Sequence, residues 1–101
     1  RNRLSETMAD LARSPSREER LFIAGRLALL AAEFHLRTSR RWIGEGKHLY
    51  RSLRECSPER AAALGAALEA LCARGDPSPL LAECRSILEP FGGELIVGYE
   101  R

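Results

Sequence analysis

The sequence predicts an all-α fold: an irregular four- to five-helix bundle with a short extended C-terminal segment. Aromatic residues make up only 6% of the chain while Ala and Leu are abundant, and this composition favours helices over sheets. Apolar residues recur three and four positions apart over long stretches, as on the buried face of a helix. Ser, Pro and Gly stand between these stretches, where they mark helix starts and ends. The 101 residues are expected to form a single helical domain with its own core.

Residues 1–15 contain the first predicted helix, which we expect at the periphery of the bundle. Leu4, Met8 and Leu11 follow one another at i, i+4 and i+7, so they share one face of this helix. The Ser-Pro-Ser sequence that follows ends the helix.

The second predicted helix is long, from about Arg17 to about Ser39, and it begins with a capping box formed by Ser16 and Glu19. Its apolar residues cover most of its circumference. They are Phe22, Ile23, Leu27, Leu29, Leu30, Phe34 and Leu36. A helix that is apolar on so many sides is typical of the centre of a bundle.

Helical periodicity continues after the second helix, where Trp42, Leu49 and Leu53 fall on one face that we expect to pack against the bundle. Gly44 and Gly46 each weaken a helix by about 1 kcal/mol relative to Ala. The sequence therefore leaves two alternatives for this segment, a continuous helix and a turn or kink at the glycines.

Two more helices follow, each opened by Ser-Pro. We expect Ser57 as an N-cap with Pro58 in the first helical position, and Gly75 as the residue that ends this helix. Ser78 repeats the start signal, and Pro90 with the glycines after it stops the last helix. The predicted core of the bundle comprises Ile23, Leu27, Leu30, Phe34, Leu49, Leu53, Leu64, Leu68, Leu71, Leu81, Cys84 and Leu88.

The last residues, 91–101, are expected to be extended because they include β-branched and aromatic side chains. A single strand cannot form a sheet, so we expect this segment to pack across the bundle or to pair with a strand of a second copy or another domain. One interpretation of a chain that begins at Arg1 rather than Met is that it is a fragment of a longer protein.

A cluster of cations lies between residues 37 and 54, where six Arg and Lys residues accompany one carboxylate, Glu45. The whole chain carries a net charge of only +2, which gives no general electrostatic case for nucleic-acid binding. The cluster itself would favour an anion. The candidate residues for binding an anion or substrate are Arg40, Arg41, Lys47, His48 and Arg51. The alternative interpretation is a solvated, Arg-rich helix face that binds no ligand.

A complete active site or metal site is not recognisable in the sequence. A phosphate-binding loop needs G-x-x-x-x-G-K-[ST], but His48 follows Lys47 where Ser or Thr is required. The three cysteines form no C-x-x-C and the two aspartates are far apart, so neither zinc nor another cofactor is expected. His35 lies just off the apolar side of its helix, which favours a boundary or core residue over a catalytic base.

The cysteines and the apolar runs bear on where the protein works. Cys72 and Cys84 fall on apolar helix stripes, where Cys acts as a small hydrophobic residue, and we expect a reducing, cytoplasmic environment. The longest uninterrupted apolar run is Leu27–Ala32, far shorter than the ~20 residues that a membrane span needs. We therefore expect no membrane partner.

The segment RRWIGEGKHLYRSLRE, preceded by a long apolar helix and followed by SPERAAALGAALEAL, resembles the C-terminal helical domain of bacterial nucleotidyltransferase-like proteins of the polymerase-beta superfamily. In that family a long helix leads into an Arg-rich stretch with a G-x-G-K-like core. The residues that carry the resemblance are Gly44, Gly46, Lys47, Leu49, Arg51, Leu53 and Arg54. The ending EPFGGELIVGYER is also similar to the ending of such chains, and the likeness covers roughly residues 18–101.

The resemblance implies a helical bundle that packs beside a nucleotidyltransferase domain and helps to shape its acceptor-substrate pocket. The catalytic hallmark of the family is a Gly-Ser followed by a D-x-D that binds Mg²⁺, and this chain has neither. The resemblance therefore implies a non-catalytic domain, with a nucleotidyltransferase catalytic domain or a nucleotide as its partner. The alternative function is a helical protein-interaction or oligomerisation module without a ligand site. The wide apolar circumference of the central helix and the unpaired C-terminal segment favour this alternative.

Overall fold

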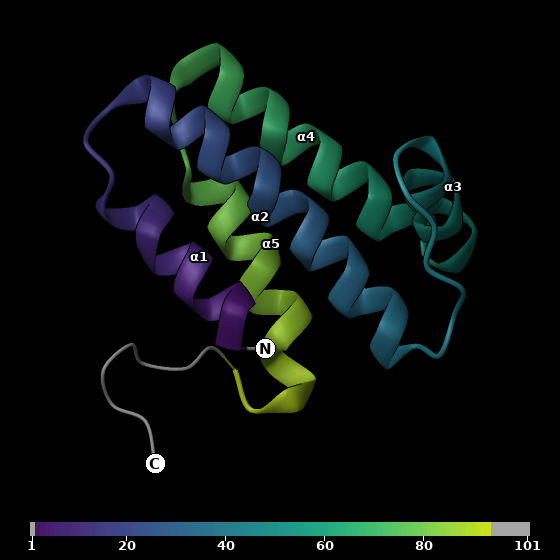
Figure 1. Ribbon diagram of the computed structural model, residues 1–101. Helices are drawn as coiled ribbons and strands as arrows, with labels where there is room; N and C mark the ends of the chain where they lie inside the picture. Colours follow the sequence, from purple (N-terminus) through teal and green to yellow (C-terminus); the bar gives the residue numbers. More distant parts are fainter. Residues whose placement is uncertain (1, 94–101) are drawn as a thin grey trace.

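The computed structural model describes residues 2–93, in which the regular structure is helical throughout, and this confirms the predicted all-α class (Figure 1). The helices are α1 (Asn2–Arg13), α2 (Arg17–Thr38), α3 (Lys47–Cys56), α4 (Pro58–Arg74) and α5 (Ser78–Leu88), followed by the short 3₁₀ helix η1 (Glu89–Phe91). The segment expected to be extended is residues 91–101; its first residue, Phe91, lies in η1 instead, and from Glu94 onward it lies outside the described residues.

Helix α2 lies at the centre of the bundle, as its apolar circumference predicts. It packs against α1, α3, α4 and α5, while α5 also contacts α1 and α4 (Figure 1). The bundle measures 37 × 35 × 19 Å. It is therefore only about two helices thick, since a helix with its side chains is roughly 10 Å across. In so thin a bundle the other helices do not cover every side of α2.

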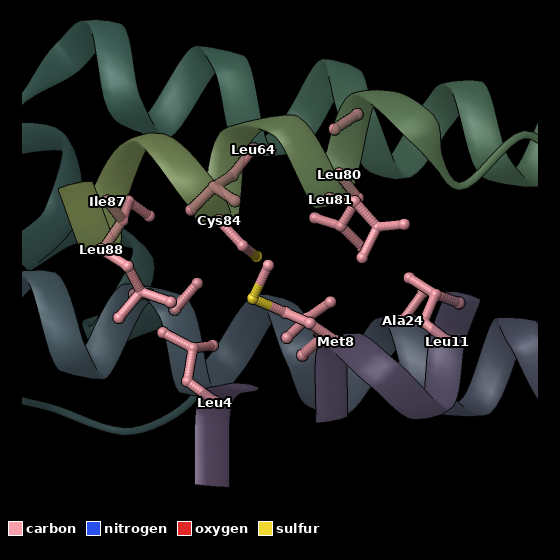
Figure 2. Packing of buried hydrophobic residues seen from close by; sticks show 14 of the residues in the cluster. Leu4, Met8, Leu11, Ala24, Leu64, Leu80, Leu81, Cys84, Ile87 and Leu88 are labelled. Atoms are coloured by element: carbon pink, nitrogen blue, oxygen red, sulfur yellow. The ribbon is translucent and has the colours of Figure 1, made fainter. Parts of the chain in front are cut away.

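The core forms where α1 and α5 close over α2 (Figure 2). Met8 of α1 and Cys84 of α5 are buried and point toward one another there. The predicted core residues that are buried are Leu27, Leu49, Leu53, Leu64, Leu71, Leu81, Cys84 and Leu88. Leu4 and Leu11 are buried together with Met8, so helix α1, expected at the periphery, supplies three side chains to the core.

The buried stripe of α2 differs from the predicted one. The predicted core residues that are only partly buried, at the edge of the core, are Ile23, Leu30, Phe34 and Leu68. Leu27 is buried as predicted, and the other buried residues of α2 are Ala24, Ala31, Ala32 and Leu36. Small alanine side chains leave room for neighbouring helices to approach α2 closely, so this side of α2 can be buried without large residues.

The predicted caps are present at the start of α2 and at both ends of α4. The Ser16 and Ser57 hydroxyls accept hydrogen bonds from the N–H groups of Glu19 and Arg60. Gly75 ends α4 in a left-handed conformation, with φ 70°. Each of these helix ends is set by the cap residue itself, Ser16, Ser57 or Gly75, so it can be predicted from the sequence without knowing the rest of the fold.

The start of α5 differs from its prediction. The Ser-Pro signal predicts Ser78 as an N-cap, but Ser78 is the first residue of α5 and Pro77 is the cap. Asp76 supplies the side-chain hydrogen bond instead, because its Oδ1 accepts from the Ser78 N–H at 3.0 Å. Hydrogen bonds from the backbone and side chain of Ser78 hold the pKa of Asp76 below its ordinary value.

Of the two alternatives after α2, the structure has the turn. Helix α2 ends at Thr38, residues 39–46 form a loop, and α3 begins at Lys47. Trp42 therefore lies on a loop with 69% of its surface exposed, so the prediction that it packs against the bundle is wrong.

A hydrogen-bonded motif ends α2 and places Arg40 in a left-handed conformation, with φ 59°. The Arg40 N–H donates to the Arg37 carbonyl at 3.1 Å, and the Arg41 N–H donates to the Leu36 carbonyl at 2.9 Å. These are the two bonds of a Schellman motif, in which glycine usually occupies the left-handed position. A residue with a Cβ is strained there by roughly 1 kcal/mol. Helix α2 thus ends without the glycine that marks such an end in a sequence.

Replacing Arg40 with Gly should raise the free energy of unfolding by about 1 kcal/mol, because glycine adopts a positive φ without strain. Urea unfolding followed by circular dichroism measures the change. The matched control is Arg40→Ala, which removes the same side chain but keeps a Cβ and should leave the stability nearly unchanged. Equal effects of the two substitutions would contradict strain at this position.

Candidate functional site

The predicted anion-binding residues are all exposed, on the loop after α2 and on α3; they are Arg40, Arg41, Lys47, His48 and Arg51. Arg41 lines a shallow hollow of about 100 Å³ together with Trp42, Ser52 and Glu55. The structure thus places Arg41 beside the Trp42 ring, in a hollow that also holds the carboxylate of Glu55.

Gly44 is buried beneath two side chains of this region. The rings of Trp42 and His48 meet edge to face with their centroids 6.4 Å apart. A Cβ on Gly44 would lie 2.6 Å from the His48 Cβ and 2.9 Å from the Trp42 ring. Only glycine fits under these two residues, so the loop stays close to the start of α3. The sequence predicts Gly44 only as a helix-weakening residue.

His35 is a half-buried boundary residue beside an ion pair that links α4 and α5. Arg60 of α4 donates hydrogen bonds to Glu83 and Ser86 of α5. Burial lowers the pKa of His35 and Arg60 lowers it further, while Glu83 acts in the opposite direction. The contacts of Arg60 join α4 to α5, and the position of His35 beside them is that of a boundary residue of the bundle.

Between residues 2 and 93, no group of three or more His, Cys, Asp or Glu side chains is placed to hold a metal ion. No helix in this range has both the length and the apolar character that crossing a membrane requires. Cys72, predicted to lie on the apolar stripe of its helix, is exposed, whereas Cys84 is buried as predicted.

A groove between α2, α3 and α4 is a surface that the sequence does not single out. Its hollow has a volume of about 170 Å³, opens to solvent and is lined almost entirely by apolar atoms. Its walls include Ala28 and Leu29 of α2, Tyr50 of α3, and Gly65 and Leu68 of α4. A cavity on the order of 150 Å³ holds a benzene ring, so this hollow has room for one large apolar side chain.

The apolar surface continues along α2 from this groove to Phe22. A second hollow shares Leu29 with the first and is lined by Leu21, Phe22, Gly25, Arg26 and Leu29. Phe22 is 85% exposed, and Leu29 and Tyr50 are each 52% exposed. The bundle therefore does not enclose the whole apolar circumference that the sequence predicts for α2, since Phe22 and Leu29 belong to it. We call the continuous surface the α2 face and define it by Phe22, Gly25, Leu29, Tyr50, Gly65 and Leu68. The sequence signal for it is the i, i+3, i+7 spacing of its α2 residues.

Comparison with known proteins gives no relative: no protein-family model, no curated protein and no solved structure matches the chain. The resemblance to nucleotidyltransferase-like proteins therefore remains a prediction. The candidate functions differ in which surface they use. One uses the basic loop, which we define as residues 39–46 between α2 and α3, and the other uses the α2 face.

Leu27 and Leu29 provide a matched test of which side of α2 the fold itself needs. Leu27 is fully buried, so Leu27→Ala should lower the free energy of unfolding by about 2–5 kcal/mol. Leu29 is half exposed, so Leu29→Ala removes the same atoms and should lower it by about 1 kcal/mol or less. Urea unfolding measures both values. Comparable losses would mean that the α2 face serves the stability of the bundle.

Proposed function

We propose that the chain is a helical protein-interaction module whose α2 face binds an apolar helical surface of a protein partner. The observation that carries this proposal is the exposure of Phe22 and Leu29 on the helix at the centre of the bundle. A helix that is apolar on nearly all sides is typical of a protein interior. Within residues 2–93, the other helices leave this side of α2 uncovered, and a partner would supply the missing neighbour.

Burial of the α2 face would stabilise a complex mainly through the hydrophobic effect. Complete burial of a Phe or Leu side chain contributes roughly 1.5–3 kcal/mol. Phe22, Leu29 and Tyr50 would together offset much of the entropy lost on association. Among the residues that line the two hollows, Arg26 is the one with a charge. A surface so poor in acids, bases and nucleophiles is suited to binding rather than to catalysis.

Photo-crosslinking at the α2 face tests this proposal. With a benzophenone amino acid in place of Leu29, the full-length protein should form protein adducts in the cells that produce it. Phe22→Asp in the same chain should abolish these adducts, because a carboxylate cannot enter an apolar interface without a large desolvation penalty. The control carries the benzophenone at Ala82, which is exposed on α5. Adducts that persist with Phe22→Asp, or that form equally from position 82, would contradict the proposal.

A second proposal concerns the loop after α2, and one observation favours it. Trp42 exposes 69% of its surface and lines a hollow together with Arg41. An exposed aromatic ring beside an arginine is suited to stack on a nucleobase while the guanidinium contacts a phosphate. This would be the role that the resemblance implies: a non-catalytic domain that helps to shape a nucleotide or acceptor-substrate site of a nucleotidyltransferase-like protein.

Titration with ATP and Mg²⁺ tests the second proposal, because Trp42 is the single tryptophan and reports binding directly. Binding should quench its fluorescence and shift the backbone amide signals of residues 40–48, and Arg41→Ala should weaken both effects. Adenosine, which lacks phosphates, is the control ligand and should bind more weakly. Unchanged fluorescence and amide signals at millimolar ATP would contradict nucleotide binding by this chain.

A further inference from the structure

We infer that the partner of the α2 face is a second copy of this chain, bound antiparallel about a two-fold axis that passes close to Gly25. In this arrangement Phe22 of each copy enters the hollow beside Leu29 of the other. The inference rests on the proposed interaction function and adds to it the identity and orientation of the partner.

The first support is that a projection and a hollow of matching size lie on the same side of α2. Phe22 projects with 85% of its surface exposed. The 170 Å³ hollow begins at Leu29, two helical turns further along, at a distance of roughly 10 Å along the axis. A two-fold rotation between them reverses α2 end to end and brings each Phe22 to the hollow of the other copy. A surface that matches itself under such a rotation is what an isologous dimer requires.

The second support comes from two glycines inside helices. A Cβ added at Gly25 or Gly65 would meet nothing within 4 Å, so the packing of this chain does not require glycine at either position. Each lowers the stability of its helix by about 1 kcal/mol relative to Ala. Gly44 is the contrast, because its neighbours leave no room for a Cβ. Glycines that line the hollows of the α2 face would let the backbone of a second helix approach closely.

The third support is the distribution of charge at the two ends of the α2 face. Glu18 lies one turn before Phe22 on the same side of α2. At the other end Arg54 lies one turn after Tyr50, and its guanidinium is 5.4 Å from the centre of the Tyr50 ring. The antiparallel arrangement brings Glu18 of one copy toward Arg54 of the other, so opposite charges meet.

Three further charged side chains at this surface are compatible with the arrangement. Lys47, one turn before Tyr50, adds to the positive end, and Glu69, one turn after Gly65, adds to the negative end. Arg26 lies near the axis, where its apolar stem can stay in contact with the face while its charged end reaches solvent.

Sedimentation equilibrium of the full chain from micromolar to millimolar concentration tests the inference. The dimer fraction should rise with concentration, and Phe22→Ala should weaken dimerisation about tenfold or more. Gly25→Leu should weaken it as well, because its side chain fills the space needed for the second helix. Trp42→Ala removes another large exposed aromatic residue outside the α2 face and should leave dimerisation unchanged. Circular dichroism verifies that each variant is folded.

A charge exchange tests the orientation. Glu18→Arg and Arg54→Glu should each weaken the dimer, because each places like charges opposite one another. The double variant should restore association, since the pair then forms with its charges reversed. A double variant weaker than either single variant would overturn the antiparallel arrangement.

The remaining outcomes separate this inference from the proposed function. A chain that stays monomeric at all concentrations overturns the inference, and so does a dimer that Phe22→Ala does not weaken. If a monomeric chain still forms Phe22-dependent adducts from position 29 with a different protein, the interaction function stands and its partner is that protein. If neither a dimer nor such adducts form, the interaction function is wrong as well.

Discussion

The packing of α2 is the constraint on which the rest of the structure depends. This helix contacts every other helix of the bundle, and the side that faces the core is lined by Ala24 and Ala31 around a buried Leu27. Along one direction the bundle measures 19 Å, which is about two helices. The opposite side of α2 still carries Phe22 and Leu29, which a bundle about two helices thick does not enclose. The α2 face is therefore a consequence of the same packing that forms the core.

Much of the fold could be predicted from the sequence because helix ends depend on local signals, such as the Ser57 cap and Gly75. Burial could not be predicted as well. Leu30 and Ala31 are apolar neighbours, and the position of the adjacent helices, rather than either residue alone, decides which of them faces the core. The loop around Trp42 was ambiguous because α2 ends at a left-handed Arg40, where the usual signal is glycine. The wide apolar circumference of α2 and the spacing of Phe22, Gly25 and Leu29 indicate the candidate site in the sequence, but they do not show which side of the helix stays uncovered.

The two candidate surfaces differ in the size of the interactions that they offer. Exposed charges such as Arg40 and Lys47 each contribute about 1 kcal/mol or less when they pair in water, and salt screens them further. Burial of an exposed Phe22 contributes roughly 1.5–3 kcal/mol and is insensitive to such screening. For this reason the apolar α2 face carries the main proposal, while charges at its ends determine orientation. Helix α3 joins the two surfaces, since Tyr50 belongs to the α2 face and His48 contacts Trp42 in the basic loop.

The most direct measurement of the central claim, that the α2 face is an interface between copies, is carbene footprinting of the intact chain at low and at high concentration. Labelling of Phe22, Leu29 and Tyr50 should fall as the concentration rises, because association covers these side chains. Trp42 is exposed to a similar degree outside the face, and its labelling should stay constant. Unchanged labelling of Phe22, or an equal fall at Trp42, would contradict the account.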